Sequence, residues 1–346
     1  MRIFSIIVAN VFLFLWVANG AAAQMTVHHM DVAQGDATLI EFQTAAILID
    51  VGGSKRGETR DHLIQYLDRF FERRVDLKRS LYSLIITHPH ADHLEWILHI
   101  LRRYNVNNLV DAGDRRKHGS VAKMKEARSI FAQQAGALPR SKFYNRIDAA
   151  DIGPDGYVTN LFKDLRRKEP VIDLRFVNAS RACKNPNNDS VVVRVGYGET
   201  KLLVTGDAED EEDSQCVPAI PRMLDKFRGN EILDVDIYKA GHHGSHNGTN
   251  QAYLQRLSPK ITIISAGHET DRNAKDYGHP RLAAVQQILS STSMQRPLKR
   301  AYALAKAKAE PTSINIDRAV YCTCWDGDIT IKTDKTGKIL SIDTTR

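Results

Sequence analysis

Three histidines and one aspartate lie within six consecutive positions directly after an apolar stretch, and this pattern constrains the chain more than any other feature. The apolar stretch Leu81–Ile86 predicts a buried strand. It is followed by His88, His90, Asp92 and His93. On an extended turn, His88 and His90 would project to one side and share one metal ion. Asp92 and His93, at the start of the next predicted helix, would turn toward a second. Imidazole nitrogens with a carboxylate suit zinc, manganese or iron.

Two later predicted strands also end in residues that bind metals. Asp207 follows the strand Lys201–Thr205 and one glycine. Its carboxylate could bridge two cations, and capping of the following helix is the alternative role. The strand Val235–Lys239 leads to His242 and His243, and we expect His242 to bind the second metal. His243 is its nearest rival, and the histidine that is not a ligand would hydrogen-bond the substrate or a coordinating carboxylate.

His279 lies just before the predicted helix Pro280–Leu289, where it could bind an anionic group or transfer a proton. A capping or surface role is the alternative, and we expect His246 to be a bystander. Metal ions at a shared rim would lower the pKa of bound water and polarise a phosphoryl or carbonyl oxygen. Asp92 and His279 are therefore the candidate catalytic residues. No Ser-His-Asp arrangement, Walker loop or glycine-rich dinucleotide motif offers a rival, so the sequence predicts metal-assisted hydrolysis.

The sequence predicts a leader followed by one domain. Residues 1–23 combine one arginine, a short apolar run and Ala21–Ala23, which indicates a signal peptide cleaved after Ala23. An uncleaved anchor is the alternative. We expect residues 24–346 to form a secreted or periplasmic hydrolase domain without a membrane span. Strands and helices interleave in two similar halves, which favours two sheets between helical layers. We predict that residues 114–170, irregular apart from the helix Val121–Ala135, are an insertion.

The chain is basic, with a formal net charge of +7. Basic residues cluster at Arg115–Lys117, Arg166–Lys168, Lys299–Arg300 and Lys306/Lys308. This excess suits an anionic partner such as nucleic acid. Ordinary solvated faces are the alternative explanation.

Four cysteines fit an oxidising compartment and allow three pairings. Cys322 and Cys324 lie two apart on a predicted strand, Ala319–Cys324, so both would point to one face, and we do not expect them to bond each other. Disulfides from these two to Cys183 and Cys216 are the expectation. A zinc site built from the thiols is disfavoured because the chain has no CxxC pair.

The motifs together resemble those of the metallo-β-lactamase superfamily and, within it, the hydrolase domain of the ComEC family of competence proteins. They occur in the family's order and cover nearly all of residues 24–346, apart from residues 114–170. The resemblance is carried by Asp31–Ala37, Leu48–Gly53, Thr87–His93, Asn188–Ser190, Gly206–Glu209, Lys239–Ser245 and Tyr277–Pro280.

The resemblance implies an α+β fold, a four-layer αβ/βα sandwich, with two divalent metal ions, zinc or manganese, at the sheet edge and Asp207 as the bridging ligand. It implies scaffold, second-sphere or substrate-binding roles for Asp31, Asp36, Asp50, Asn188, Ser190, Lys239, His243 and Ser245. For Asp50 a plain turn role is equally compatible.

The sequence departs from the family in two places. A further histidine ligand of the first metal has no counterpart, since the matching region reads Asn187–Ser190. The occupancy of the first site and the identity of its metal therefore stay open. The membrane channel that accompanies this domain in competence proteins also has no counterpart, so we expect a chain that does not itself import DNA.

The leading hypothesis is a phosphodiesterase, possibly a nuclease, that acts on an anionic substrate such as DNA or RNA. Hydrolysis of another ester, a lactone, a phosphocholine or a β-lactam is the first alternative, because one fold can host many activities. A non-catalytic binding module is the second.

Overall fold

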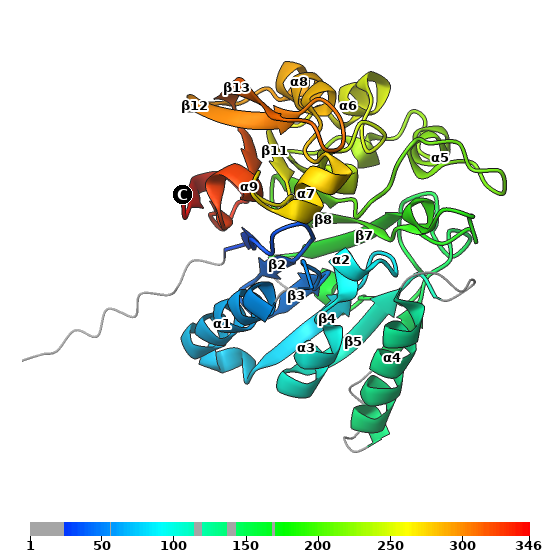
Figure 1. Ribbon diagram of the computed structural model, residues 1–346. Helices are drawn as coiled ribbons and strands as arrows, with labels where there is room; N and C mark the ends of the chain where they lie inside the picture. Colours follow the sequence, from blue (N-terminus) through cyan, green and yellow to red (C-terminus); the bar gives the residue numbers. More distant parts are fainter. Residues whose placement is uncertain (1–23, 56, 114–119, 137–142, 168–169) are drawn as a thin grey trace, which may run out of the picture.

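The computed structural model describes residues 24–55, 57–113, 120–136, 143–167 and 170–346 (Figure 1). The predicted leader, residues 1–23, and the basic cluster Arg115–Lys117 lie outside the described residues. Among the helices of the described chain, none is long and apolar enough to cross a membrane.

The first sheet has eight strands in the order β16-β15-β1-β2-β3-β4-β5-β6. Its strands are β1 (Thr26–His29), β2 (Thr38–Glu41), β3 (Ala46–Ile49), β4 (Ser80–Ile85), β5 (Asn105–Asp111), β6 (Phe143–Arg146), β15 (Ile329–Thr333) and β16 (Ile339–Thr344). The strands from β16 to β3 pair antiparallel, whereas those from β3 to β6 pair parallel. Strands β3 and β4 of the parallel part are mostly buried, as is usual where both faces of a sheet are covered.

Helices α1 (Gly57–Arg73), α3 (Ile97–Arg103) and α4 (Val121–Gly136) cover the outer face of this sheet (Figure 1). Helix α1 is amphipathic: Leu63, Leu67 and Phe70 follow helical spacing and are buried. They pack with sheet residues such as Leu48 and Leu84. The apolar period of α1 thus fixes which side of the helix meets the sheet.

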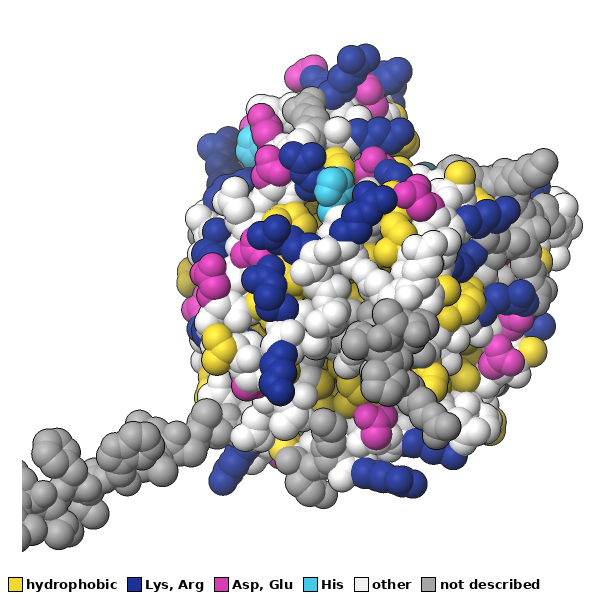
Figure 2. Space-filling view, turned by 90° about the horizontal axis from the view of Figure 1, so that it is seen from below, with side chains coloured by type: hydrophobic (Ala, Val, Ile, Leu, Met, Phe, Trp, Pro, Cys, Tyr) yellow, Lys and Arg dark blue, Asp and Glu magenta, His cyan; other side chains and the backbone are white. Residues whose placement is uncertain are grey.

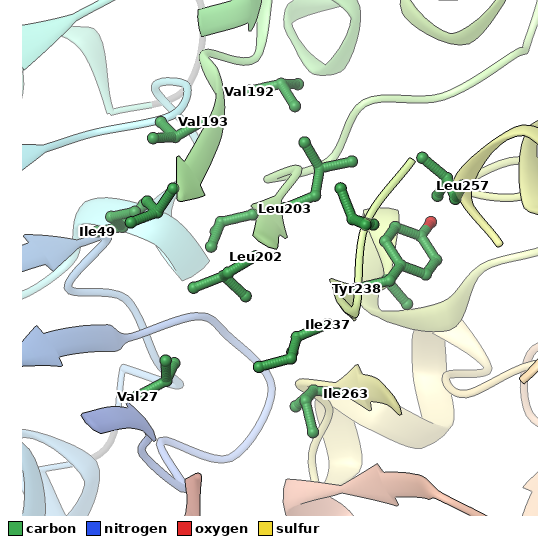
Figure 3. Close-up of a cluster of buried hydrophobic side chains, with 14 of the residues drawn as sticks. Val27, Ile49, Val192, Val193, Leu202, Leu203, Ile237, Tyr238, Leu257 and Ile263 are labelled. Carbon is green, nitrogen blue, oxygen red and sulfur yellow. The ribbon is translucent and has the colours of Figure 1, made fainter. Parts of the chain in front are cut away.

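The second sheet has six strands in the order β14-β11-β10-β9-β8-β7. Its strands are β7 (Ile172–Asn178), β8 (Val192–Tyr197), β9 (Thr200–Val204), β10 (Ile237–Lys239), β11 (Ile261–Ile264) and β14 (Val320–Cys322). The helices α5 (Ala219–Lys226), α6 (Gln251–Leu257) and α8 (Leu282–Ser291) belong to this half. Figure 3 shows Val27 and Ile49 of the first sheet facing Leu202, Ile237 and Ile263 of the second, within one core cluster. The structure therefore confirms the predicted sandwich of two sheets between helical layers.

Part of the predicted insertion belongs to the first sheet. Helix α4 buries Met124 and Phe131 against the sheet's outer cluster. Strand β6 pairs parallel with β5 and extends the sheet by one strand. The sequence predicted the helix but not the strand, because β6 lies at the sheet edge with mostly exposed side chains and has no apolar alternation.

A second unpredicted feature is the hairpin of β12 (Gln295–Leu304) and β13 (Pro311–Arg318), which forms a two-stranded sheet of its own. It buries only a few small or aliphatic side chains, including Ala301, Ala303 and Ile316. Most of its other residues are polar, so the segment lacks the regular apolar period from which strands are predicted.

The predicted cysteine pairing is wrong. The structure joins Cys183 to Cys216 and Cys322 to Cys324. The expectation failed because the predicted strand Ala319–Cys324 ends at Cys322, and residues Thr323–Asp326 form a helical turn, α9. The turn brings the Cα atoms of Cys322 and Cys324 to 5.0 Å, within the usual range for a disulfide.

Basic side chains are dispersed on the face that Figure 2 shows, where they alternate with acidic and uncharged groups. One predicted basic cluster is structural: Lys299 donates to the carboxylate of Asp326 at 2.8 Å, and Asp326 is fully buried. Arg300 donates to the hydroxyl of Ser313 at 2.7 Å. The net charge therefore does not by itself mark a binding surface.

Candidate metal centre

The histidine-rich loop between β4 and the short helix α2 (Ala91–Leu94) is held from beneath by Asp50. Asp50 follows β3 in a left-handed conformation, with φ of 59°. Its carboxylate accepts hydrogen bonds from the backbone N–H and the hydroxyl of Thr87, each at 2.8 Å. Gly52 lies so close to α2 that a Cβ there would overlap the carbonyl of Asp92. The loop's position thus depends on one carboxylate and one glycine.

In two histidines, Nδ1 lies against a hydrogen-bond acceptor. The Nε2 atoms of both rings therefore point toward a common centre. The Nδ1 of His93 lies 2.7 Å from the Asp50 carboxylate. The Nδ1 of His243 lies 2.8 Å from the carbonyl oxygen of Ser265. The two Nε2 atoms lie 3.3 Å apart. Histidines that bind metals are oriented by a carboxylate or a carbonyl in this way, so the donor set fits a metal ion.

Two groups of side chains could each hold a cation, and Asp207 belongs to both. In each group the candidate ligand atoms lie within 4.8 Å of one another. The groups are His88, His90 and Asp207, and Asp36, His93, Asp207 and His243. One Asp207 oxygen lies 3.6 Å from the Nε2 of His88 and the other lies 3.1 Å from the Nε2 of His93. The carboxylate therefore lies between two imidazole clusters, each with the nitrogen and oxygen donors that divalent transition metals prefer.

The position of Asp207 follows from the end of β9. The chain turns at Gly206, whose φ of 53° favours glycine and whose Cα packs against Thr87. The hydroxyl of Ser190, just before β8, accepts the backbone N–H of Asp207 at 3.2 Å. Asn188 has a supporting role, because its side-chain oxygen accepts the N–H of Ala219 at 2.8 Å.

The electrostatics of the centre keep Asp207 ionised. Burial alone would raise its pKa, but His93 and His243 lower the pKa well below the usual range. Burial would lower the pKa of His93, but the carboxylates of Asp207 and Asp50 raise it well above the usual value. Burial and the neighbouring His93 lower the pKa of His88. The centre thus offers a carboxylate anion beside a neutral imidazole.

The structure brings His243, rather than His242, into the cluster. Both residues lie in the 3-10 turn Gly241–Gly244 after β10, with left-handed backbone angles. The Nδ1 of His242 lies 2.9 Å from the carboxylate of Glu209, and the ring is partly exposed. The geometry therefore favours His243 as the metal ligand, which was the alternative in the sequence analysis. His242 instead contacts a carboxylate and lines the cleft.

Glu209 is a residue of the candidate site to which the sequence analysis gave no role. It is fully buried. Besides His242, its carboxylate accepts hydrogen bonds from the side-chain amides of Asn187, at 3.1 Å, Asn247, at 3.0 Å, and Asn185. Its place two residues after Asp207, within the motif Gly206–Glu209, was the available signal. Glu209 therefore holds Asn187 in place. Asn187 belongs to the region Asn187–Ser190, which lacks the further histidine that the family resemblance implied.

Asp36 and Lys239 form an ion pair in which both side chains are buried. Lys239 is the last residue of β10 and Asp36 precedes β2, so the pair joins the two sheets beneath the histidines. The other oxygen of Asp36 has no hydrogen-bond partner among the described residues, and Asp36 belongs to the second ligand group. Lys239 therefore neutralises one oxygen of Asp36 and leaves the other available.

The remaining predicted site residues occupy different places. Asp92 lines the cleft above the centre, with its carboxylate 3.3 Å from the Nε2 of His243. Ser245 is buried, and its N–H donates to the carbonyl of His242. Asp31 contacts the C-terminal segment instead of the candidate metal centre. Its carboxylate accepts a hydrogen bond from Arg346, and its N–H donates to the carboxylate of Asp328.

A cleft of about 660 Å³ opens above the candidate centre. It is lined by Gln34, Gly53, Ser54, Lys55, His90, Ala91, Asp92, Asn187, Asp207, His242, His243, Asn273, Tyr277 and His279. A larger cavity of about 810 Å³ lies at the other end of the first sheet, where Arg73 and Arg74 are already bound to Glu41. The two cavities share no lining residue, so the cleft connects the histidine cluster to solvent independently of the larger cavity.

His279 presents a hydrogen-bond donor to this cleft. Its Nδ1 lies 3.1 Å from the side-chain nitrogen of Gln34, which donates the bond, while the N–H of Gly267 contacts the Gln34 oxygen. Burial and the neighbouring His243 lower the pKa of His279 well below its usual value. A neutral imidazole that accepts at Nδ1 carries its proton on Nε2. Gln34 lies within the motif Asp31–Ala37, but the sequence analysis gave it no role because its contact with His279 joins residues 245 positions apart.

Comparison with known proteins identifies the family. The family model of the metallo-beta-lactamase superfamily matches residues 30–268. The chain belongs to this superfamily. Its membership confirms the resemblance inferred from the motifs. Both candidate ligand groups lie in the matched region, whereas Asn273, Tyr277 and His279 of the cleft wall come after it.

Curated relatives of the chain include ComE operon protein 3 of Bacillus subtilis (strain 168), 24% identical over 296 residues, which covers 82% of this chain and 33% of that protein. Recombination protein 2 of Haemophilus influenzae is 28% identical over 240 residues, which covers 69% of this chain and 24% of that protein. Competence protein ComA of Neisseria gonorrhoeae is 30% identical over 118 residues, 34% of this chain and 15% of that protein. The chain thus matches only a minor part of each.

Two solved structures resemble the chain distantly, one of a metallo-beta-lactamase fold protein and one of a metallo hydrolase. YhfI from Bacillus subtilis is 11% identical with a TM-score of 0.41, covering 85% of this chain and 99% of that one. Igni18, a metallo hydrolase from Ignicoccus hospitalis KIN4/I, is 12% identical with a TM-score of 0.39, covering 84% and 98%.

Proposed function

We propose that this metallo-beta-lactamase protein is a two-metal phosphodiesterase that acts on nucleic acid. The observation that carries the proposal is the shared carboxylate of Asp207, which lies between two imidazole clusters beneath an open cleft. Two cations about 4 Å apart are the usual arrangement of metal-dependent phosphodiesterases and nucleases.

We assign His88, His90 and Asp207 to the first divalent ion and Asp36, His93, Asp207 and His243 to the second, with zinc or manganese as the metals. When bound, such ions act as Lewis acids and lower the pKa of water enough to supply a nucleophile near neutral pH. Asp92 stands beside the second group and at the cleft wall, where it can accept a proton from a nucleophilic water.

Two histidines of the chain can position the substrate. His279 directs an N–H into the cleft, because Gln34 occupies its other nitrogen. His242 contacts the buried carboxylate of Glu209 through Nδ1, so its remaining ring nitrogen is available to an oxygen of the substrate. Donors at fixed positions stabilise the negative charge that grows on a phosphoryl group in the transition state.

The names of two relatives support nucleic acid as the substrate class, since one is a recombination protein and one a competence protein. The formal charge of +7 agrees with an anionic partner. We also propose that the chain is exported. Two disulfides in the described residues suit a compartment outside the cytoplasm, and the predicted leader supplies the route.

The test is turnover by the purified protein loaded with zinc or manganese. We expect hydrolysis of bis-p-nitrophenyl phosphate and of DNA or RNA oligonucleotides, which chelation abolishes and the metal restores. A lactone, a phosphocholine ester and the β-lactam nitrocefin complete the panel. Turnover of one of these three with none of the phosphodiesters would contradict the proposal, as would a well-folded protein that binds no metal.

The choice between His243 and His242 gives a separate prediction. Replacing His243 with alanine removes an imidazole from the second group. Loss of a residue that only contacts a metal ligand already lowers metal affinity about 10- to 100-fold. We therefore expect the affinity for the second ion to fall by at least about tenfold. His242→Ala should keep the wild-type metal content. Titration with zinc, followed by measurement of bound metal per chain, compares the two variants. The reverse pattern would assign the site to His242.

A further inference from the structure

Tyr277 extends a series of aromatic rings from the candidate metal centre to the surface. It is the last residue of α7 (Arg272–Tyr277), lines the cleft and is 60% exposed. Its ring lies 6.1 Å from that of His279, with 19° between the planes. The ring of His279 lies 5.8 Å from that of His243, with 29° between the planes. Three successive rings thus lead from a candidate metal ligand to solvent, and each is stacked on the next.

The backbone around Tyr277 is held in place. Gly278 follows in a left-handed conformation and donates its N–H to the carbonyl of Ala274 at 2.8 Å. The guanidinium of Arg281 donates to the carbonyl of Tyr277 at 3.2 Å. A ring on such a support can serve as a fixed surface for a ligand, because little conformational freedom is left to lose on binding.

A basic turn lies beside this ring. We use the name basic turn for residues 305–310, which connect β12 and β13 beside α7 (Figure 1). The turn packs on the end of α7: the N–H of Lys308 donates to the carbonyl of Lys275 at 2.8 Å, and Gly278 lies against Ala307. Lys306 and Lys308 are exposed, and neither has an ion-pair partner in the part of the chain that the structure describes.

We propose that Tyr277 stacks on an unpaired base of a nucleic-acid strand whose phosphates contact Lys306 and Lys308. This inference rests on the proposed function and adds a specificity-determining residue to it. A planar, exposed ring beside positive charge has the two elements of sites that bind single strands, a stacking platform and a basic track. Since a base in a duplex is already stacked on both faces, the site selects a strand that is unpaired at this nucleotide.

The experiment compares two ligands that differ only in their bases. One is a fluorescein-labelled thymidine hexamer with phosphorothioate linkages, which resist hydrolysis, and the other is its abasic counterpart. Fluorescence anisotropy with the zinc-loaded protein gives both dissociation constants. Tyr277→Ala should weaken binding of the thymidine hexamer about tenfold and leave binding of the abasic one unchanged. Tyr277→Phe, which retains the ring, should bind both as the wild type does.

The controls separate stacking from charge and from folding. Phe143→Ala removes another exposed ring, 58% exposed on the edge strand β6, and should change neither constant. The double variant Lys306→Ala/Lys308→Ala should weaken both hexamers equally and reduce the slope of log affinity against log salt by about two. Thermal melting of each variant checks that the protein is folded.

The inference fails if the wild type binds both hexamers equally, or if Tyr277→Ala weakens both or neither. Its failure is distinct from that of the proposed function. A protein that hydrolyses bis-p-nitrophenyl phosphate but does not distinguish the two hexamers rejects the stacking site alone. A protein that distinguishes them through Tyr277 but hydrolyses no phosphodiester retains the stacking site and rejects the phosphodiesterase.

Discussion

Replacing Asp207 with asparagine should reduce phosphodiester turnover on the order of 10³-fold, the size of effect that follows loss of one electrostatic contributor in an active site. Asp207 is the one side chain that belongs to both ligand groups. Asparagine has nearly the same shape but no charge, so it weakens both metal positions at once. We therefore expect bound metal to fall from two ions per chain, and metal addition to raise the melting temperature less than in the wild type.

Asp225 provides a matched control for this variant. It is exposed on α5, where its ion-pair partner Arg228 is exposed as well. Asp225→Asn makes the same chemical change at an exposed position outside both ligand groups and should leave turnover, metal content and melting temperature unaltered. Wild-type metal content and rate in the Asp207→Asn variant would show that the carboxylate is not a shared ligand, and the proposed mechanism would be lost with it.

The second large effect is expected at Lys239. Replacing this lysine with methionine keeps the volume of the side chain but leaves the buried carboxylate of Asp36 without its cation. Removing one partner of a buried ion pair costs about 3–5 kcal/mol, so the free energy of unfolding should fall by that amount. Urea denaturation of the metal-free protein at neutral pH measures it, and the absence of metal keeps the loss separate from metal binding.

Lys201→Met is the control for this loss. Lys201 pairs with Asp234 at 3.2 Å, and both side chains are partly exposed. Water and salt screen such a pair, so its removal should cost no more than about 1 kcal/mol. Adding Asp36→Leu to Lys239→Met should restore part of the lost stability, because no buried charge then remains unpaired. A Lys239→Met variant as stable as the Lys201→Met variant would contradict the structural role assigned to the pair.

Much of the candidate site was predictable because its residues follow apolar strands. The strands before His88 and Asp207 both end in apolar residues, at Leu84–Ile86 and Leu202–Val204, which indicates that these ends are buried. A polar residue directly after such a strand must lie near a sheet edge. The family resemblance then implied that the two strands end on the same side of the molecule. In the structure, the Nε2 of His88 lies 3.6 Å from the carboxylate of Asp207.

Other features depended on contacts that a sequence does not display. The role we assign to Glu209 rests on contacts from two separate segments, one with Asn187 and the other with His242 and Asn247. The hairpin of β12 and β13 buries too little apolar surface to show a period. The pairing of Cys322 with Cys324 followed from a helical turn that replaced the end of a predicted strand.

The sequence by itself determined the family, the layered α+β fold and the histidine-rich loop, because these rest on local apolar periods and closely spaced polar motifs. Our choice of His243 over His242 as the proposed metal ligand depended on the tertiary structure alone. The two residues are adjacent and share the same left-handed backbone, so no local pattern distinguishes them. The carbonyl of Ser265 holds the His243 ring toward the centre and the carboxylate of Glu209 holds that of His242. Both acceptors lie more than twenty residues away along the chain, and folding alone brings them to the site.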